Sequence, residues 1–227
     1  MRGDTVAVIV AHPDDEVLGF GGTICRHAEA GDAVHVLFLA TGLAARSPDG
    51  KVTPEEIAGL RQEALSAGKI LGVTSIEFAD FPDNRMDTVA LLDVVKRVDD
   101  FVEKTQATLI YTHHAGDLNI DHSICARAVL TACRPIPGAR TRKIYAGEIL
   151  SSSEYAIAQD RFRPTTYIGI EPYIGRKREA LQSYTREVRY WPHPRSIKAV
   201  ALLARLRGSE CGAEAAEAFA LIREVRV

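Results

Sequence analysis

A histidine, two aspartates and a glutamate stand together near the start of the chain, directly after an apolar stretch. His12 and Asp15 are three residues apart on a tight turn, so both side chains can reach one cation. Imidazole together with carboxylate suits zinc, and also iron or manganese. Asp14 lies between them and is placed to take a proton from a water bound to such a metal. These residues indicate activation of water at a metal centre.

The elements around this turn place it where ligands bind. Residues 6–11 are apolar and small or β-branched, which predicts a strand buried on both faces, and Pro13 ends it. In open α/β sheets, ligands bind beyond the carboxyl ends of the strands. The simpler alternative is a turn in which Asp14 or Asp15 only caps the following helix, predicted over residues 23–30. That alternative fits a lone aspartate better than this cluster.

A second polar cluster follows another predicted strand, at residues 109–112. Its chemistry-bearing members are His113, His114, Asn119, Asp121 and His122. Since both clusters follow strands, we expect them at neighbouring strand ends of one sheet. Together they contain enough imidazole and carboxylate groups for a complete metal site.

The stretch Ala11–Glu16 resembles the signature of the LmbE-like (PIG-L) zinc-dependent N-acetylglucosaminyl deacetylases. The resemblance extends in separated patches over nearly the whole chain. The other patches are Arg61 with Leu71-Gly72, the pair Asp121-His122, Pro192–Ser196, and Arg207–Ser209 with Ala216–Phe219.

The resemblance implies roles for five of these residues. It implies that His12, Asp15 and His122 hold a divalent metal, most simply zinc. Asp14 would take the proton of the attacking water and could later hand it to the leaving nitrogen. Asp121 is adjacent to a ligand, and we expect it to orient His122 or a neighbouring group.

Other polar side chains are expected to contact the substrate. The resemblance associates Arg61 with substrate contact near the metal, although a solvated arginine on a predicted helix is an equal alternative. Asp83, Asn84 and Arg85 follow a short predicted strand. A sugar with several hydroxyl groups needs such donors and acceptors, but these residues could also simply form a turn.

The sequence departs from the family pattern at Asn119, where most members carry a histidine that protonates the leaving group or stabilises the oxyanion. Asn119 does not titrate near neutral pH, but it can donate a hydrogen bond to an oxyanion. The proton must then come from Asp14 or from one of three histidines predicted in loops, His113, His114 and His193. We rank His193 first among the histidines, because two prolines brace it. His113 and His114 are also expected to reach the substrate.

Composition excludes several classes of protein. The chain has 227 residues and a formal net charge of −2, without a long basic run, so nucleic acid is not an expected partner. Its four cysteines are scattered, which favours reduced thiols in a cytoplasm. The start of the chain lacks the shape of a signal peptide, and no apolar run is long enough to span a bilayer. The sequence leaves the oligomeric state open, a homo-oligomer included.

Strands alternating with helices predict one domain over residues 1–227, with a doubly wound, mostly parallel sheet of about five to seven strands. This α/β architecture agrees with the Rossmann-like, LmbE-like fold that the resemblance implies. Residues 143–148 and 165–170 are shorter and more polar than the other predicted strands, which is typical of edge strands.

The function expected from the resemblance is metal-dependent hydrolysis of the N-acetyl group of an amino sugar or its conjugate, with release of acetate. Three alternatives stay open. The first is a nucleotide-binding module, suggested by Gly19, Gly21 and Gly22, although position 24 lacks the glycine that a Gly-x-Gly-x-x-Gly motif needs. The second is a metal-binding protein without catalysis. The third is hydrolysis of a thiol conjugate or another non-acetyl amide.

Overall fold

The computed structural model describes residues 4–44 and 51–226 of the chain. Within them, seven strands form one sheet in the order β3-β2-β1-β4-β5-β7-β6. The strands are β1 (Thr5–Val10), β2 (Ala33–Ala40), β3 (Ser75–Phe81), β4 (Leu109–His113), β5 (Lys143–Gly147), β6 (Thr166–Gly169) and β7 (Ala216–Glu224). The strands β1 to β5 pair in parallel, whereas β7 is antiparallel to both β5 and β6. The predicted mostly parallel sheet is confirmed.

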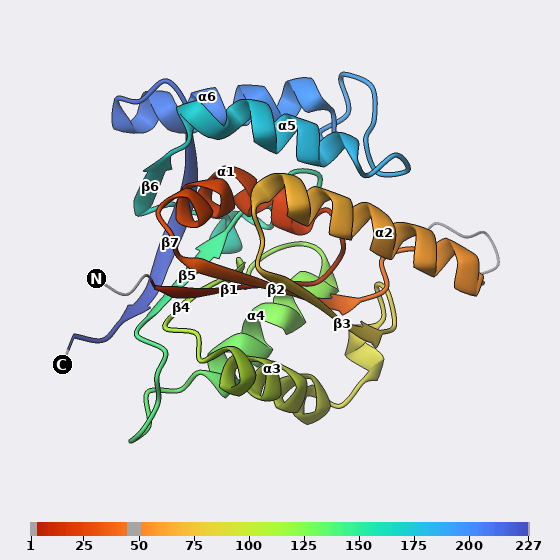
Figure 1. Cartoon of the computed structure of the whole chain (residues 1–227), viewed down its shortest axis with the longest axis vertical. Helices are drawn as coiled ribbons and strands as arrows, with labels where there is room; N and C mark the ends of the chain where they lie inside the picture. Colours follow the sequence, from red (N-terminus) through yellow and green to blue (C-terminus); the bar gives the residue numbers. More distant parts are fainter. Residues whose placement is uncertain (1–3, 45–50, 227) are drawn as a thin grey trace.

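Helices cover both faces of this sheet (Figure 1). They are α1 (Asp15–Glu29), α2 (Pro54–Leu71), α3 (Leu91–Thr105), α4 (Ile120–Ala132), α5 (Ile174–Gln182) and α6 (Ile197–Cys211). In Figure 1, α1 and α2 lie against one face with α5 beyond them, α6 lies on the same side next to β7, and α3 and α4 lie against the other face. The structure is therefore doubly wound, as predicted.

The continuous apolar run of β1 follows from this arrangement. Val6, Val8 and Val10 belong to the core beneath α1 and α2, whereas Ala7 and Ile9 belong to the core beneath α3 and α4. Because successive strand residues point to opposite faces, a strand covered on both sides must be apolar throughout.

The chain changes direction across the sheet between β1 and β4. From β1 it proceeds through β2 to the β3 edge, and then it returns to place β4 on the other side of β1. Open α/β sheets bind ligands at such a switch point, beyond the carboxyl ends of the strands. Both polar clusters predicted from the sequence follow these two strands.

The glycines after β1 lie inside α1, which begins at Asp15, earlier than predicted. They allow close packing against other elements. A Cβ atom on Gly22 would lie 2.6 Å from Ile170, and one on Gly19 would lie 2.7 Å from Ile149. Both separations are shorter than side chains tolerate, so packing accounts for these glycines without a bound nucleotide.

The structure also bears on the edge strands and on membranes. The prediction that 143–148 forms an edge strand is wrong, because β7 pairs with β5 and only β6 lies at that edge.

In the described parts of the chain, no helix has the length and apolar character needed to cross a membrane. All four cysteines are free thiols.

Candidate metal centre

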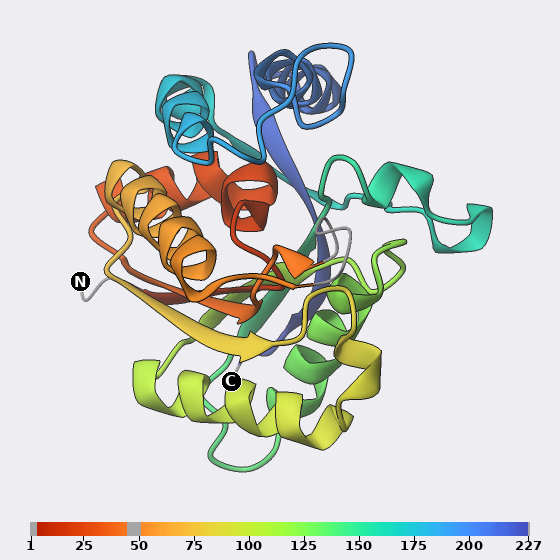
Figure 2. The same ribbon diagram turned by 90° about the vertical axis from the view of Figure 1, so that its right-hand side faces the viewer.

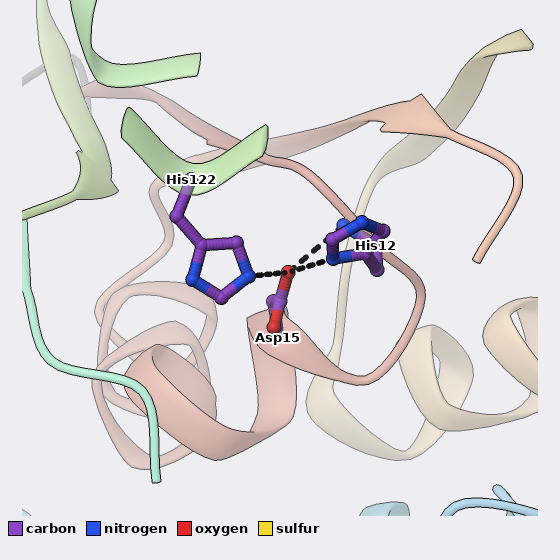
Figure 3. Close-up of side chains that lie close together, drawn as sticks. All are labelled: His12, Asp15 and His122. Atoms are coloured by element: carbon purple, nitrogen blue, oxygen red, sulfur yellow. Dashed lines mark hydrogen bonds and ion pairs between the residues drawn. The ribbon is translucent and has the colours of Figure 1, made fainter. Parts of the chain in front are cut away.

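Three predicted ligands from two distant parts of the chain lie together (Figure 3). His12 comes from the turn after β1, Asp15 is the first residue of α1, and His122 comes from the first turn of α4. Asp15 Oδ2 lies 3.4 Å from His12 Nδ1 and 3.3 Å from His122 Nε2. All three side chains are buried, and their ligand atoms are close enough to hold one ion.

This geometry fits a divalent transition metal. Ligand atoms about 2.0–2.1 Å from a tetrahedral zinc are separated by about 3.3–3.4 Å from one another. The separations of Asp15 Oδ2 from the two imidazoles match that value. Among the described residues, His122 Nε2 is buried and finds no hydrogen-bond partner. Buried polar atoms are normally satisfied, and a cation would satisfy this nitrogen.

Asp117 holds His122 from the side away from the metal position. Its Oδ1 lies 3.2 Å from His122 Nδ1, and its carboxylate also accepts hydrogen bonds from the hydroxyls of Ser152 and Ser153. Burial raises the pKa of Asp117, but the neighbouring imidazole and hydroxyls outweigh burial and lower that pKa to about 2. A carboxylate in this position fixes the tautomer of an imidazole ligand. Sequence reasoning missed Asp117, whose only signal was its place within the second polar cluster.

His113 supports His122 from within the sheet. Their rings stack in parallel with centroids 3.9 Å apart, and His113 Nε2 accepts a hydrogen bond of 2.8 Å from the backbone N–H of Ala11. Burial lowers the pKa of His113 to about 3, so the ring is neutral. The prediction that His113 lies in a loop is wrong: it is the fully buried last residue of β4.

Asp121 orients His12 rather than His122. Its Oδ2 lies 3.0 Å from His12 Nε2, and Asp83 Oδ1 lies 3.2 Å from the same nitrogen. Asp121 also accepts backbone hydrogen bonds from Asn84 (2.6 Å) and Met86 (3.0 Å). His12, Asp83 and Asp121 could themselves surround an ion. Since both Asp121 oxygens already accept peptide N–H groups, we interpret the two carboxylates as partners that hold His12 in place.

Asn119 is the N-cap of α4. Its side-chain oxygen accepts a hydrogen bond of 2.9 Å from the backbone N–H of Asp121, and its Nδ2 donates to Asn84 Oδ1 at 2.9 Å. Asn84 in turn donates to Asp83 Oδ1 at 2.9 Å. The residue that replaces the expected histidine therefore ties α4 to the loop of residues 83–85. Of that loop, Asp83 is buried and reaches the cluster, whereas Arg85 is exposed.

Asp14 adjoins the predicted ligand Asp15, and its carboxylate contacts the C-terminal part of the chain. Its side chain is buried, and its Oδ2 accepts a hydrogen bond of 2.8 Å from Arg195. His193, two residues before Arg195, is exposed, and its Nδ1 accepts a hydrogen bond of 3.0 Å from the backbone N–H of Arg195. The loop that carries His193, which the sequence predicted to approach the site, therefore contacts Asp14 through Arg195.

The contacts of Arg61 and His114 lead away from the three ligands. The Arg61 guanidinium pairs with the Asp80 carboxylate and lies 5.0 Å above the Phe78 ring. His114 Nε2 lies 2.6 Å from the carbonyl oxygen of Asp160. Asp160 belongs to the segment with η3 (Ser153–Tyr155) and η4 (Ala158–Asp160), which stands out beside the sheet (Figure 2). The structure does not place either side chain at the cluster.

Comparisons with known proteins show the family of the chain and several relatives. The profile of the PIG-L family, described as GlcNAc-PI de-N-acetylase, matches residues 7–133, which is more than half of the chain. A 4-oxalmesaconate hydratase from Pseudomonas putida is 29% identical over 198 residues, covering 82% of this chain and 75% of the relative. A probable N-acetyl-alpha-D-glucosaminyl L-malate deacetylase 2 from Bacillus anthracis is 23% identical over 186 residues, covering 80% of each.

A solved structure shares the fold. That of N,N'-diacetylchitobiose deacetylase from Pyrococcus horikoshii, in complex with an inhibitor, superposes with a TM-score of 0.78 at 18% sequence identity. The match covers 97% of this chain and 84% of that one. At 18% sequence identity, this structural similarity shows a shared fold.

Proposed function

The chain belongs to the PIG-L family, and from that premise we propose that it is a metal-dependent hydrolase that removes the acetyl group from the nitrogen of an amino sugar or amino-sugar conjugate. The observation that carries the proposal is the buried set His12, Asp15 and His122, with ligand atoms at tetrahedral separations. The described family activity and the Bacillus anthracis relative supply the substrate class.

The three ligands would hold zinc and leave a position open for water. Zinc bound there would supply Lewis acidity, which polarises an amide carbonyl and lowers the pKa of a water ligand to about 7. Asp14 adjoins Asp15 in the chain, and in this proposal its carboxylate accepts the proton of the attacking water. His12 and His122 are each fixed from behind by a carboxylate, Asp121 and Asp117.

The nitrogen that leaves when the amide is cleaved needs a proton. The contacts of the described residues limit which side chains can donate that proton. His113 is buried in β4, and His114 is engaged by the carbonyl of Asp160. Asp14, which has received the proton of the water, is the first source in this proposal, and His193 is the second. Asn119 Nδ2 donates to Asn84 and carries a second N–H, which can serve an oxyanion.

The test is release of acetate from a panel of N-acetylated amino sugars and conjugates by zinc-loaded protein. The panel includes thiol conjugates and longer acyl amides, since the same attack would cleave them. Asp14→Asn should keep the metal and lose about 10²–10⁴-fold in kcat, because the amide cannot accept a proton. Asp100→Asn, at an exposed position of α3, is the matched control and should leave kcat unchanged. Loss of metal in Asp14→Asn would make Asp14 a ligand and refute its assigned role.

A second candidate is hydration of a carbon–carbon double bond in an unsaturated oxo acid. The Pseudomonas putida hydratase favours it, because the match to that protein covers most of both chains. The same panel separates the two functions. Loss of the ultraviolet absorbance of a conjugated oxo acid, without acetate release from any amide, would establish the hydratase and overturn the deacetylase.

A further inference from the structure

The backbone of Asp14 adopts a conformation that non-glycine residues rarely take. Its φ is 111° and its ψ is −26°, in the left-handed half of conformational space. Such a conformation persists only where surrounding contacts hold it, and it is typical of functional sites. The contacts that hold Asp14 are therefore informative.

Two buried side chains hold its backbone. The N–H of Asp14 donates to Glu16 Oε2 at 3.0 Å, and Glu16 Oε1 accepts a hydrogen bond of 2.5 Å from the hydroxyl of Tyr184. Glu16 is 1% exposed and Tyr184 is fully buried. Tyr184 follows the end of α5 and lies 170 positions after Asp14 in the chain. Its hydroxyl holds the Glu16 carboxylate that accepts the Asp14 N–H.

Two other side chains hold its carboxylate. Arg195 Nη1 donates to Asp14 Oδ2 at 2.8 Å and to Glu187 Oε2 at 2.9 Å. The carboxyl-bearing side chains are 1% and 2% exposed, and that of Arg195 is 15% exposed. A partly buried guanidinium shared by two buried carboxylates has little freedom to move, and it fixes the direction of both.

We infer that Glu16, Tyr184, Glu187 and Arg195, which we call the Asp14 clamp, are positioning residues that hold the Asp14 carboxylate toward the metal position. Three of the four lie beyond residue 133, where the match to the family profile ends. In this inference the N-terminal part of the chain supplies the ligands, the base and Glu16, and residues 184–195 supply the other three groups that orient the base. This inference rests on the proposed function.

The first test is Arg195→Ala in zinc-loaded protein. Displacing a catalytic group by about 1 Å costs about 100-fold in rate. We expect kcat to fall about 10- to 100-fold while KM and metal content stay within about twofold. Added guanidinium ion should restore part of kcat by occupying the vacated position. Arg186→Ala is the matched control, since Arg186 lies in the same segment and pairs at 3.4 Å with Glu56 on the surface.

The second test uses Tyr184→Phe, which keeps the buried ring and removes only the hydroxyl, and circular dichroism should show a folded protein. It should also lower kcat with unchanged KM. Residues that act through Asp14 are non-additive with it. In an Asp14→Asn background, therefore, neither Arg195→Ala nor Tyr184→Phe should lower the residual rate further. Additive losses, or a wild-type kcat in either single variant, would overturn the inference and leave the clamp a contribution to folding.

Failure of the proposed function can be told apart from failure of the clamp. If wild-type protein turns over no amide and no unsaturated acid, the proposed function fails. Crystal structures of the two variants then decide the clamp by geometry. A φ of Asp14 outside the positive range, or a carboxylate turned away from His12 and Asp15, supports it. An Asp14 that superposes on the wild-type residue in both variants overturns it.

Discussion

Replacing Asp117 by asparagine tests whether the carboxylate behind His122 tunes the metal centre. Asparagine keeps the shape of the side chain but removes the charge 3.2 Å from His122 Nδ1, which favours a proton there and a lone pair on Nε2. Loss of such a partner weakens metal binding about 10- to 100-fold, or by about 1.4–2.7 kcal/mol. Ser152 and Ser153 can still bond to the amide, so the fold should survive.

The assay is competition for zinc between the protein and a chelator of known affinity, at fixed pH. Asp117→Asn should lose the predicted affinity while circular dichroism stays that of the wild type. Asp100→Asn carries the same change at an exposed position of α3 and should bind zinc normally. An Asp117→Asn protein that binds zinc within about twofold of the wild type would refute the role of this carboxylate.

Four further outcomes are expected. His122→Ala should lose most of its zinc in elemental analysis, and full occupancy would remove His122 from the site. Burial lowers the pKa of His122, but Asp15 and Asp117 raise it to about 9, so zinc must displace a proton at pH 7; calorimetry should show proton release and an affinity that rises toward pH 9. Arg85→Ala should raise KM if the exposed arginine contacts substrate, whereas Arg61→Ala, already paired with Asp80, should change KM less. Lys177→Met should lower the free energy of unfolding by about 3–5 kcal/mol in urea, because it removes the counter-charge 2.6 Å from the buried Glu217 carboxylate and leaves only the N–H groups of Gly22 and Thr23 bonded to it.

The sequence predicted the elements whose signal is local. The continuous apolar run of residues 6–11 identified a central strand, and the polar residues directly after it identified the turn that carries His12 and Asp15. The alternation of strands and helices identified the doubly wound sheet. Each of these inferences needs only neighbouring residues and the knowledge that both faces of a parallel sheet are covered.

Long-range partners could not be predicted in this way. The residues near Asp14 in the sequence do not indicate that Arg195 is its partner. The sequence also did not indicate that the Asp121 carboxylate contacts His12 rather than the adjacent His122. The antiparallel strand β7 was also missed, since its exposed residues break the pattern of a buried strand. The glycines of α1 suggested a phosphate site because the sequence does not show what packs against them. Their neighbours in the fold, Ile149 and Ile170, are more than 100 residues away along the chain.

The pKa values of His12 and His122, the two predicted imidazole ligands, reflect the electrostatic field that a bound metal would experience. Burial alone lowers the pKa of His12 and of His122, yet neighbouring carboxylates raise both, that of His12 well above its usual value. Conversely, burial raises the pKa of Asp15, but His122 and His12 hold it well below its usual range. A site that draws protons onto buried imidazoles against the effect of burial has an excess of negative charge. A divalent cation compensates that charge through the same atoms, so the metal and the protons compete, and affinity for the metal must rise as the protons leave.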